Sequence, residues 1–180
     1  MNLSQIGLAL GMAHGVAGLL AFLRPAAVGP WLQRFPRRVA PGVFLMLGGT
    51  AWFVWNLYSS DLSDFAEWRP IMYAGSALLG IGCCFFVQDF LAVRGACVVA
   101  LLGCDRILDV QRIHDSPWRV VVAGWCYAVI VLAVWWVQAP WRVRDLAAWL
   151  VAMPERLKRI GMGIAAFGIL LTGLALTQFR

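Results

Sequence analysis

Long apolar segments alternate with short polar connections along the whole chain. The pattern predicts α-helices at residues 6–23, 40–58, 70–87, 90–107, 120–139 and 160–178. About 20 apolar residues are needed for a helix to cross roughly 30 Å of hydrocarbon, so each segment is long enough to span a membrane. The fourth is the least apolar, because Arg94 and Asp105 lie near its ends. We therefore expect an all-α, polytopic membrane protein of about six transmembrane helices.

Two of the polar connections have similar sequences. Residues 31–38 read Trp-Leu-Gln-Arg-Phe-Pro-Arg-Arg, and residues 149–156 read Trp-Leu-Val-Ala-Met-Pro-Glu-Arg. Each connection lies between two apolar segments, so a unit of helix, basic segment and helix occurs at residues 6–58 and again at residues 120–178. The middle hairpin, residues 70–107, lacks the basic segment. We expect a single membrane domain, residues 1–180, built from three helical hairpins.

Both basic segments have the periodicity of an amphipathic helix. Apolar residues recur at helical spacing, and basic residues occupy the remaining positions. Helices of this kind lie in the plane of the membrane with their cationic side chains on lipid phosphates. The candidate head-group contacts are Arg34, Arg37, Arg38, Arg142, Arg144, Arg156, Lys158 and Arg159.

Composition supports the membrane assignment, and charge gives an orientation. Apolar residues make up 62% of the chain and charged residues 13%, which is too apolar for a soluble domain of 180 residues. Ten of the fifteen Lys and Arg fall in the connections 24–39, 88–94 and 140–159. The positive-inside rule places these connections in the cytoplasm, so both termini are expected outside it. The net charge of +6 favours anionic lipid as a partner in the cell inner membrane, and not nucleic acid.

The last third of the chain resembles a known family. Residues 140–142 read Pro-Trp-Arg, residues 153–154 read Met-Pro, and residues 157–161 read Leu-Lys-Arg-Ile-Gly before an apolar, Gly-rich run. This order is similar to that of the YjeT-type family, small two-helix inner-membrane proteins of unknown function. The match covers residues 120–178 and is repeated weakly at residues 6–58. The resemblance implies a bacterial inner-membrane hairpin and no particular activity.

His14 lies at the middle of the first predicted helix. An ionisable side chain at that depth is costly, so it is a candidate functional residue. Its imidazole could ligate the metal of a tetrapyrrole, which would make the chain a subunit of an energy-converting complex, or relay protons. Alternatively, it is a neutral histidine that hydrogen-bonds a neighbouring helix.

Cys83, Cys84 and Cys97 lie at similar depth in the third and fourth predicted helices. Thiolates are soft ligands for Hg, Cu(I) or Zn, so these cysteines are a candidate metal site of a small transporter or channel. Alternatively, they pack as small apolar side chains between helices. The sequence has no C-x-x-C motif that would complete a metal site.

Glycines form a ridge on the first and last predicted helices. Small residues at this spacing let a second helix approach closely, either a partner subunit or another helix of the same chain. The ridge residues are Gly7, Gly11, Gly15, Gly161 and Gly168.

No enzymatic motif accompanies these features. The sequence has no nucleophile elbow, P-loop or dinucleotide-binding fingerprint. The favoured function is a non-enzymatic accessory or structural subunit, without a cofactor, that self-associates or docks on a larger membrane complex through the glycine ridges. The soft-metal transporter and the tetrapyrrole-binding subunit are the alternatives.

Overall fold

The computed structural model describes residues 2–60 and 63–179, and within these residues it is all-helical, as predicted. Five helices, α1, α3, α4, α6 and α8, are long and apolar enough to cross a membrane. Two 3-10 helices accompany the α-helices. The elements are α1 (Leu3–Leu23), α2 (Pro25–Arg34), η1 (Phe35–Arg37), α3 (Val39–Ser59), η2 (Ser63–Trp68), α4 (Arg69–Phe86), α5 (Leu91–Arg112), α6 (Arg119–Gln138), α7 (Trp141–Val151) and α8 (Pro154–Thr177).

Two helices extend beyond the apolar segments that predicted them. α5 continues to Arg112, five residues past the predicted end. Its second half is charged, so α5 is not one of the five helices that are apolar enough to cross a membrane. α8 begins at Pro154, because proline fits the first helical position, where no backbone N–H partner is needed. Arg156, Lys158 and Arg159 therefore belong to the first turns of α8 and not to a separate interfacial segment.

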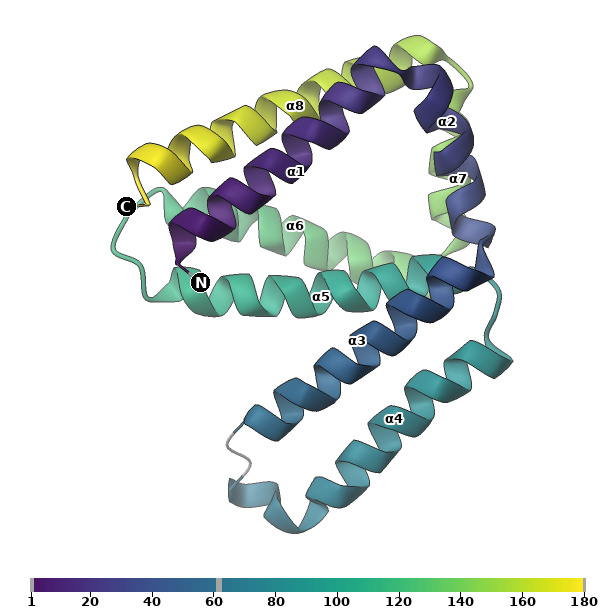
Figure 1. The fold of residues 1–180 in the computed structure, drawn as a ribbon, viewed down its shortest axis with the longest axis vertical. Helices are drawn as coiled ribbons and strands as arrows, with labels where there is room; N and C mark the ends of the chain where they lie inside the picture. Colours follow the sequence, from purple (N-terminus) through teal and green to yellow (C-terminus); the bar gives the residue numbers. More distant parts are fainter. Residues whose placement is uncertain (1, 61–62, 180) are drawn as a thin grey trace.

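The helices form a wedge (Figure 1). α1 and α8 make one layer, and α5 and α6 make the other. The layers meet at the end where both chain termini lie, and they diverge toward the opposite end, which α2 and α7 cross side by side. α3 packs against α5 on the outside of the wedge, and α4 packs mainly against α3.

Apolar residues from both layers close the narrow end of the wedge. Leu3 of α1 and Leu171 of α8 pack there with Val122 and Cys126 of α6, and all four are almost fully buried. The hydroxyl of Ser4 donates a hydrogen bond to the carbonyl oxygen of Ala175 at 3.0 Å. The start of α1 is therefore held against the end of α8, so these two helices run antiparallel.

The helices do not pair as the three predicted hairpins. α1 packs on α8 and not on α3, and α6 packs mainly on α5, meeting α8 through the side chains of the core cluster at the narrow end. The reason is the short helix that lies between the two long helices in each case. α2, of 10 residues, separates the ends of α1 and α3, and α7, of 11 residues, separates the ends of α6 and α8, each by roughly 15 Å. Packed helices lie about 8–10 Å apart. The hairpin prediction was wrong in its pairing, because the packed neighbours along the chain are α3–α4 and α5–α6.

Glycines form the contact between α1 and α8, which we call the α1–α8 seam. A Cβ atom added to Gly168 would lie 2.6 Å from the carbonyl oxygen of Gly11 and 2.8 Å from the Cα of Gly15. One added to Gly161 would lie 2.8 Å from the carbonyl oxygen of Gly18. The backbones are therefore in direct contact. Gly7 lies in the same seam against Ala175, so the glycine ridge packs within this chain.

A second glycine contact joins α3 to α5, and we call it the α3–α5 seam. A Cβ atom on Gly42 would lie 2.6 Å from the backbone nitrogen of Ala92. A Cβ atom on Gly95 would lie 2.8 Å from the backbone nitrogen of Met46. Only glycine permits this approach, which attaches α3 and α4 to the outside of the wedge.

Candidate functional site

The broad end of the wedge is covered by α2, η1 and α7, which together we call the platform. Gly29 of α2 lies against Val151 near the end of α7, and Arg37 shares a pocket with Arg144 near its start. The two helices are therefore antiparallel. α7 buries Ala147 and Leu150 of its apolar side, whereas α2 buries Gly29 and leaves Trp31 exposed.

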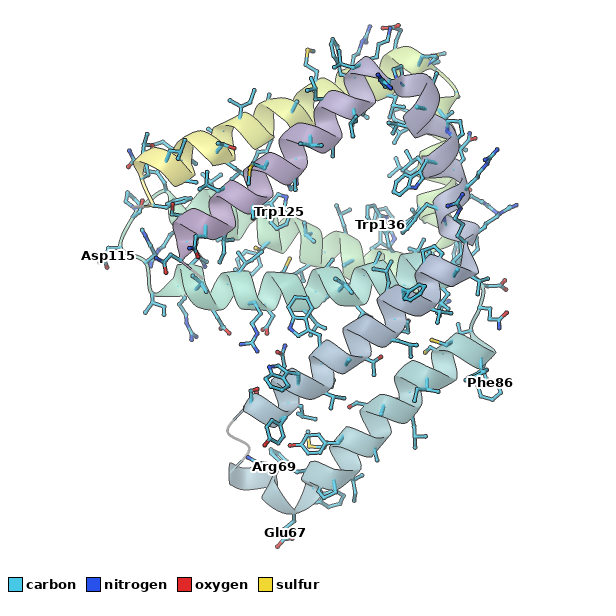
Figure 2. The ribbon with its side chains drawn as sticks, in the orientation of Figure 1. Glu67, Arg69, Phe86, Asp115, Trp125 and Trp136 are labelled. Carbon is cyan, nitrogen blue, oxygen red and sulfur yellow. The ribbon has the colours of Figure 1, made fainter. Side chains whose placement is uncertain are left out.

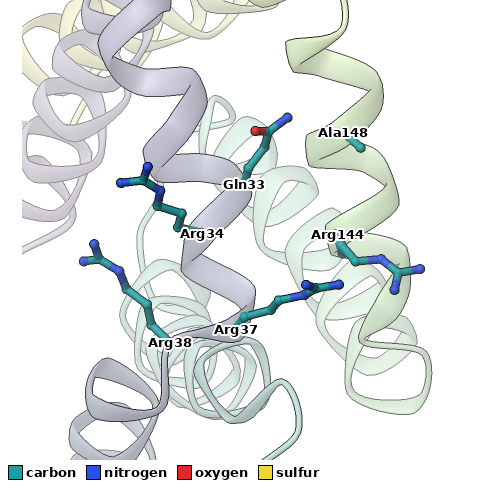
Figure 3. A pocket seen from close by; sticks show the side chains of 6 residues that line it. All are labelled: Gln33, Arg34, Arg37, Arg38, Arg144 and Ala148. Atoms are coloured by element: carbon teal, nitrogen blue, oxygen red, sulfur yellow. The ribbon is translucent and has the colours of Figure 1, made fainter.

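Four arginines in or beside the platform line one pocket: Arg34, Arg37, Arg38 and Arg144 (Figure 3). The pocket has a volume of about 520 Å³, and Gln33 and Ala148 complete its lining. Arg37 extends toward α7, whereas Arg34 and Arg38 lie on the opposite side of α2 and η1 (Figure 3).

The charge of this pocket is largely uncompensated. Arg144 forms an ion pair with Asp145 at 2.8 Å. Arg34, Arg37 and Arg38 form no side-chain hydrogen bond or ion pair with any residue in 2–60 or 63–179. Three arginines with free N–H donors line this pocket from two sides of α2 and η1, and guanidinium groups bind anions because they match phosphate and carboxylate geometry.

The other predicted head-group residues lie outside this pocket. Arg142 stacks over the ring of Trp135, with its Cζ 5.5 Å from the ring centroid. Arg156 stacks over Trp149 at 4.6 Å and donates a hydrogen bond to the carbonyl oxygen of Trp149. Cation–π contacts of this kind hold a guanidinium against its own protein surface. The remaining two lie on the first turns of α8, where Lys158 forms an ion pair with Glu155 at 2.9 Å and Arg159 does not line the pocket.

An apolar pocket of about 520 Å³ lies inside the wedge, and we call it the chamber. α5 and α6 supply most of its wall, and Trp136 projects from α6 into the interior of the wedge (Figure 2). Sequence reasoning missed the chamber, because its small and branched residues are the ordinary residues of a membrane helix. Its lining is His14, Phe35, Val93, Ala96, Cys97, Ala100, Val129, Leu132, Ala133, Trp136, Val143 and Ile164.

His14 lies at the edge of the chamber with both ring nitrogens engaged. Its Nδ1 lies 2.8 Å from the carbonyl oxygen of Leu10, which can only accept, so Nδ1 carries the proton. The indole N–H of Trp125 donates to Nε2 at 3.1 Å, so Nε2 is the acceptor. Trp125 and Phe167 also meet the imidazole edge to face, with centroids 5.3 and 5.6 Å away. The arrangement is that of a neutral histidine bonded to a neighbouring helix, and a tetrapyrrole metal would have to displace Trp125.

The His14–Trp125 hydrogen bond gives a testable coupling. Trp125→Phe leaves Nε2 without a donor, and His14→Leu leaves the indole N–H without an acceptor, so each single variant is expected to lower stability. The double variant should cost less than the sum of the two, with a coupling of about 1 kcal/mol for a hydrogen bond between membrane helices. Thermal unfolding of the four proteins in detergent measures it. Strictly additive losses would show that the hydrogen bond contributes nothing.

The structure does not bring the three candidate metal-binding cysteines together. Cys84 packs with Met46 and Leu91 where α4 meets α3 and α5. Cys97 packs with Val93 and Ala133 between α5 and α6. Cys83 and Cys84 therefore lie where α4 packs on α3, outside the wedge, whereas Cys97 lies between α5 and α6. The described residues contain no group of three His, Cys, Asp or Glu side chains placed to hold a metal ion.

Comparisons of this chain with protein-family models, with curated proteins and with solved structures found no match.

Proposed function

We propose that this chain is a non-enzymatic, multi-pass membrane protein that binds an anionic lipid head group on its platform. One observation carries the proposal: Arg34, Arg37 and Arg38 share a pocket with Arg144 and have no partner of opposite charge among the described residues. The platform crosses the ends of the apolar helices, which is the depth at which lipid phosphates lie in a bilayer.

The proposed topology has six transmembrane helices in the cell inner membrane and both termini outside the cytoplasm. α5 is the sixth span. Its 22 residues give a length of roughly 33 Å, and it packs between α3 and α6, so its polar residues need not all face lipid. The basic platform lies at the opposite end from both termini, and the positive-inside rule places it on the cytoplasmic side.

Lipid binding should depend on the platform arginines. Each basic residue near an anionic membrane surface contributes about 1 kcal/mol. Arg34→Gln with Arg38→Gln is therefore expected to weaken binding of dioleoylphosphatidylglycerol by about 2 kcal/mol, roughly 30-fold. Native mass spectrometry of the full chain in detergent, titrated with this lipid, measures the loss. Dioleoylphosphatidylcholine should bind weakly to both proteins.

A variant with the same loss of charge at the other end of the molecule is the control. Arg106 bonds to Asn56, and Arg112 is exposed at the end of α5, far from the platform. Arg106→Gln with Arg112→Gln should leave the affinity for phosphatidylglycerol unchanged. Equal affinity for phosphatidylglycerol and phosphatidylcholine in the natural sequence, or equal losses in both double variants, would contradict the proposal.

A second candidate function is that of an accessory subunit that docks on a larger membrane complex, and α4 favours it. α4 packs mainly on α3, and Leu79 and Phe86 are 73% and 89% exposed. Docking through the glycine ridges gains no support from Gly7, Gly11, Gly161 and Gly168, because α1 and α8 cover them; a Cβ atom at Gly15 would meet nothing within 4 Å. The transporter and tetrapyrrole alternatives gain none either, since the cysteines are separated and the Nε2 of His14 accepts from Trp125.

A further inference from the structure

The chamber and the arginine pocket are both lined by residues of the platform. Phe35 lines the chamber and is adjacent in sequence to Arg34, and Val143 lines the chamber and is adjacent to Arg144. The platform therefore contributes guanidinium groups to one pocket and apolar side chains to the wall of the other. We propose that the chamber is a binding site for one hydrocarbon chain of the anionic lipid whose head group binds the platform. The inference rests on the proposed function and extends it from head group to chain.

The chemistry of the chamber wall selects hydrocarbon. Apart from His14, the thiol of Cys97 and the indole N–H of Trp136, its lining side chains present only alkyl or aromatic carbon. Both nitrogens of His14 are already engaged, by Leu10 and by Trp125, so the imidazole offers nothing to a ligand. Water is unstable in such a space, because a buried water molecule needs two to four polar partners. An empty space is also unfavourable, because the side chains that line it lose dispersion contacts. Its 520 Å³ falls within the range of about 300–1,000 Å³ typical of small-molecule sites.

The occupant must carry a head group and not be a free hydrocarbon. The bilayer is as apolar as the chamber, so moving a chain from lipid into the chamber gains almost no hydrophobic free energy. Affinity has to come from the polar end of the ligand. The arginine pocket supplies it at the broad end of the wedge, next to the chamber. A glycerophospholipid meets both requirements, with one acyl chain in the chamber and the other in the surrounding bilayer.

The chamber ends at defined positions inside the wedge. His14 lines one end of the chamber and is held there by its edge-to-face contacts with Trp125 of α6 and Phe167 of α8. The platform forms its roof. Ala96 and Ala100 lie one turn apart on α5 and face the chamber, so larger side chains at these two positions would occupy the space of the ligand chain.

The test uses the full chain and a phosphatidylglycerol that carries a photoreactive diazirine near the end of one acyl chain. After irradiation, peptide mass spectrometry locates the adducts. They are expected on residues 93–100 of α5 and 129–136 of α6. Unlabelled phosphatidylglycerol should compete for them, and phosphatidylcholine should not. Ala96→Phe and Ala100→Phe, separately, should reduce these adducts about tenfold, because an overpacked site excludes the chain.

Ala128→Phe, on an exposed position of α6, is the matched control and should leave the adducts unchanged. Ala100→Leu is a milder substitution that keeps the test valid if the phenylalanine variants do not fold, and it should reduce the adducts in the same direction. Adducts confined to the outer faces of the helices, and unchanged in the filled variants, would overturn the chain site. That result would not contradict the proposed head-group site, which is tested separately with the arginine variants. Loss of the phosphatidylglycerol preference itself would overturn both proposals.

Discussion

Gly168→Leu is expected to be among the most damaging single substitutions in this chain. The new side chain would meet the backbone of Gly11 and Gly15, which cannot move away without separating α1 from α8. Overpacking of this kind costs about 3 kcal/mol at its upper range. For a protein of 180 residues this corresponds to a fall in apparent Tm of roughly 10 °C. Fluorescence-detected size exclusion after heating in detergent measures the fall.

Cysteine reactivity shows where the damage occurs. Cys126 is fully buried at the narrow end of the wedge beside Leu171 and Ala175 of α8. When α8 separates from α1, a membrane-permeable methanethiosulfonate should modify Cys126 faster, while Cys84 at α3 and α4 stays protected. Gly173→Leu is the control on the same helix, because nothing lies within 4 Å of a Cβ atom there. An unchanged Tm in Gly168→Leu would contradict the direct backbone contact in the α1–α8 seam.

Gly95→Leu is expected to detach α3 and α4 from the wedge. The added side chain would meet the backbone nitrogen of Met46 at 2.8 Å and the carbonyl oxygen of Gly42 at 3.1 Å. The cost is again about 3 kcal/mol, since backbone atoms give way less than side chains. The reactivity pattern should be the reverse of that in Gly168→Leu. Cys84 should react faster, because it is buried against α3 and α5, and Cys126 should remain protected.

Gly103→Leu, on the same helix as Gly95, is the control. It replaces a glycine that makes no close contact, so it shows how much stability changes when a helical glycine alone is lost. A Cβ atom at Gly103 meets nothing within 4 Å, and glycine is a poor helix former. Gly103→Leu should therefore leave stability unchanged or raise it slightly. If Gly95→Leu and Gly103→Leu behave alike, the α3–α5 seam is not a close contact.

The two seams also decide whether the proposed lipid site exists. The chamber has walls from α1 and α8 as well as from α5 and α6, so it requires the α1–α8 seam to keep His14 and Ile164 in place. It does not require α4, which contributes no lining residue. Loss of the α1–α8 seam is therefore expected to abolish chain binding, whereas loss of the α3–α5 seam should weaken it less.

The positions of the helices follow from the sequence, because they depend on local properties. The predicted helix 6–23 corresponds to α1 and the helix 40–58 to α3, within three residues at each end. Apolar length and the places of proline are enough for this. The platform also follows locally, since the amphipathic pattern of residues 25–38 and 140–153 is a property of single helices.

Pairing depended on tertiary structure. The repeat of helix, basic segment and helix suggested that α1 packs on α3, whereas α1 packs on α8. Nothing in the sequence states that the interposed α2 and α7 pack on each other and hold their neighbours apart. The glycines are a second example. Their spacing predicted that another helix packs closely on α1 and on α8, but it did not identify which helix.

The candidate site divides in the same way. The sequence by itself determined that Arg34, Arg37, Arg38 and Arg144 lie in basic connections between apolar helices, because that depends on local composition; the structure ends α2 at Arg34 and leaves Arg38 outside any helix. Only the tertiary structure decided that these four share one pocket while Arg156 stacks on Trp149. It also decided that His14 accepts from Trp125 and that residues of the platform line an apolar chamber. The hydrogen bond joins residues 111 positions apart, and the chamber brings together His14 and Ile164, which are farther apart still; such contacts arise only when separate helices are packed together.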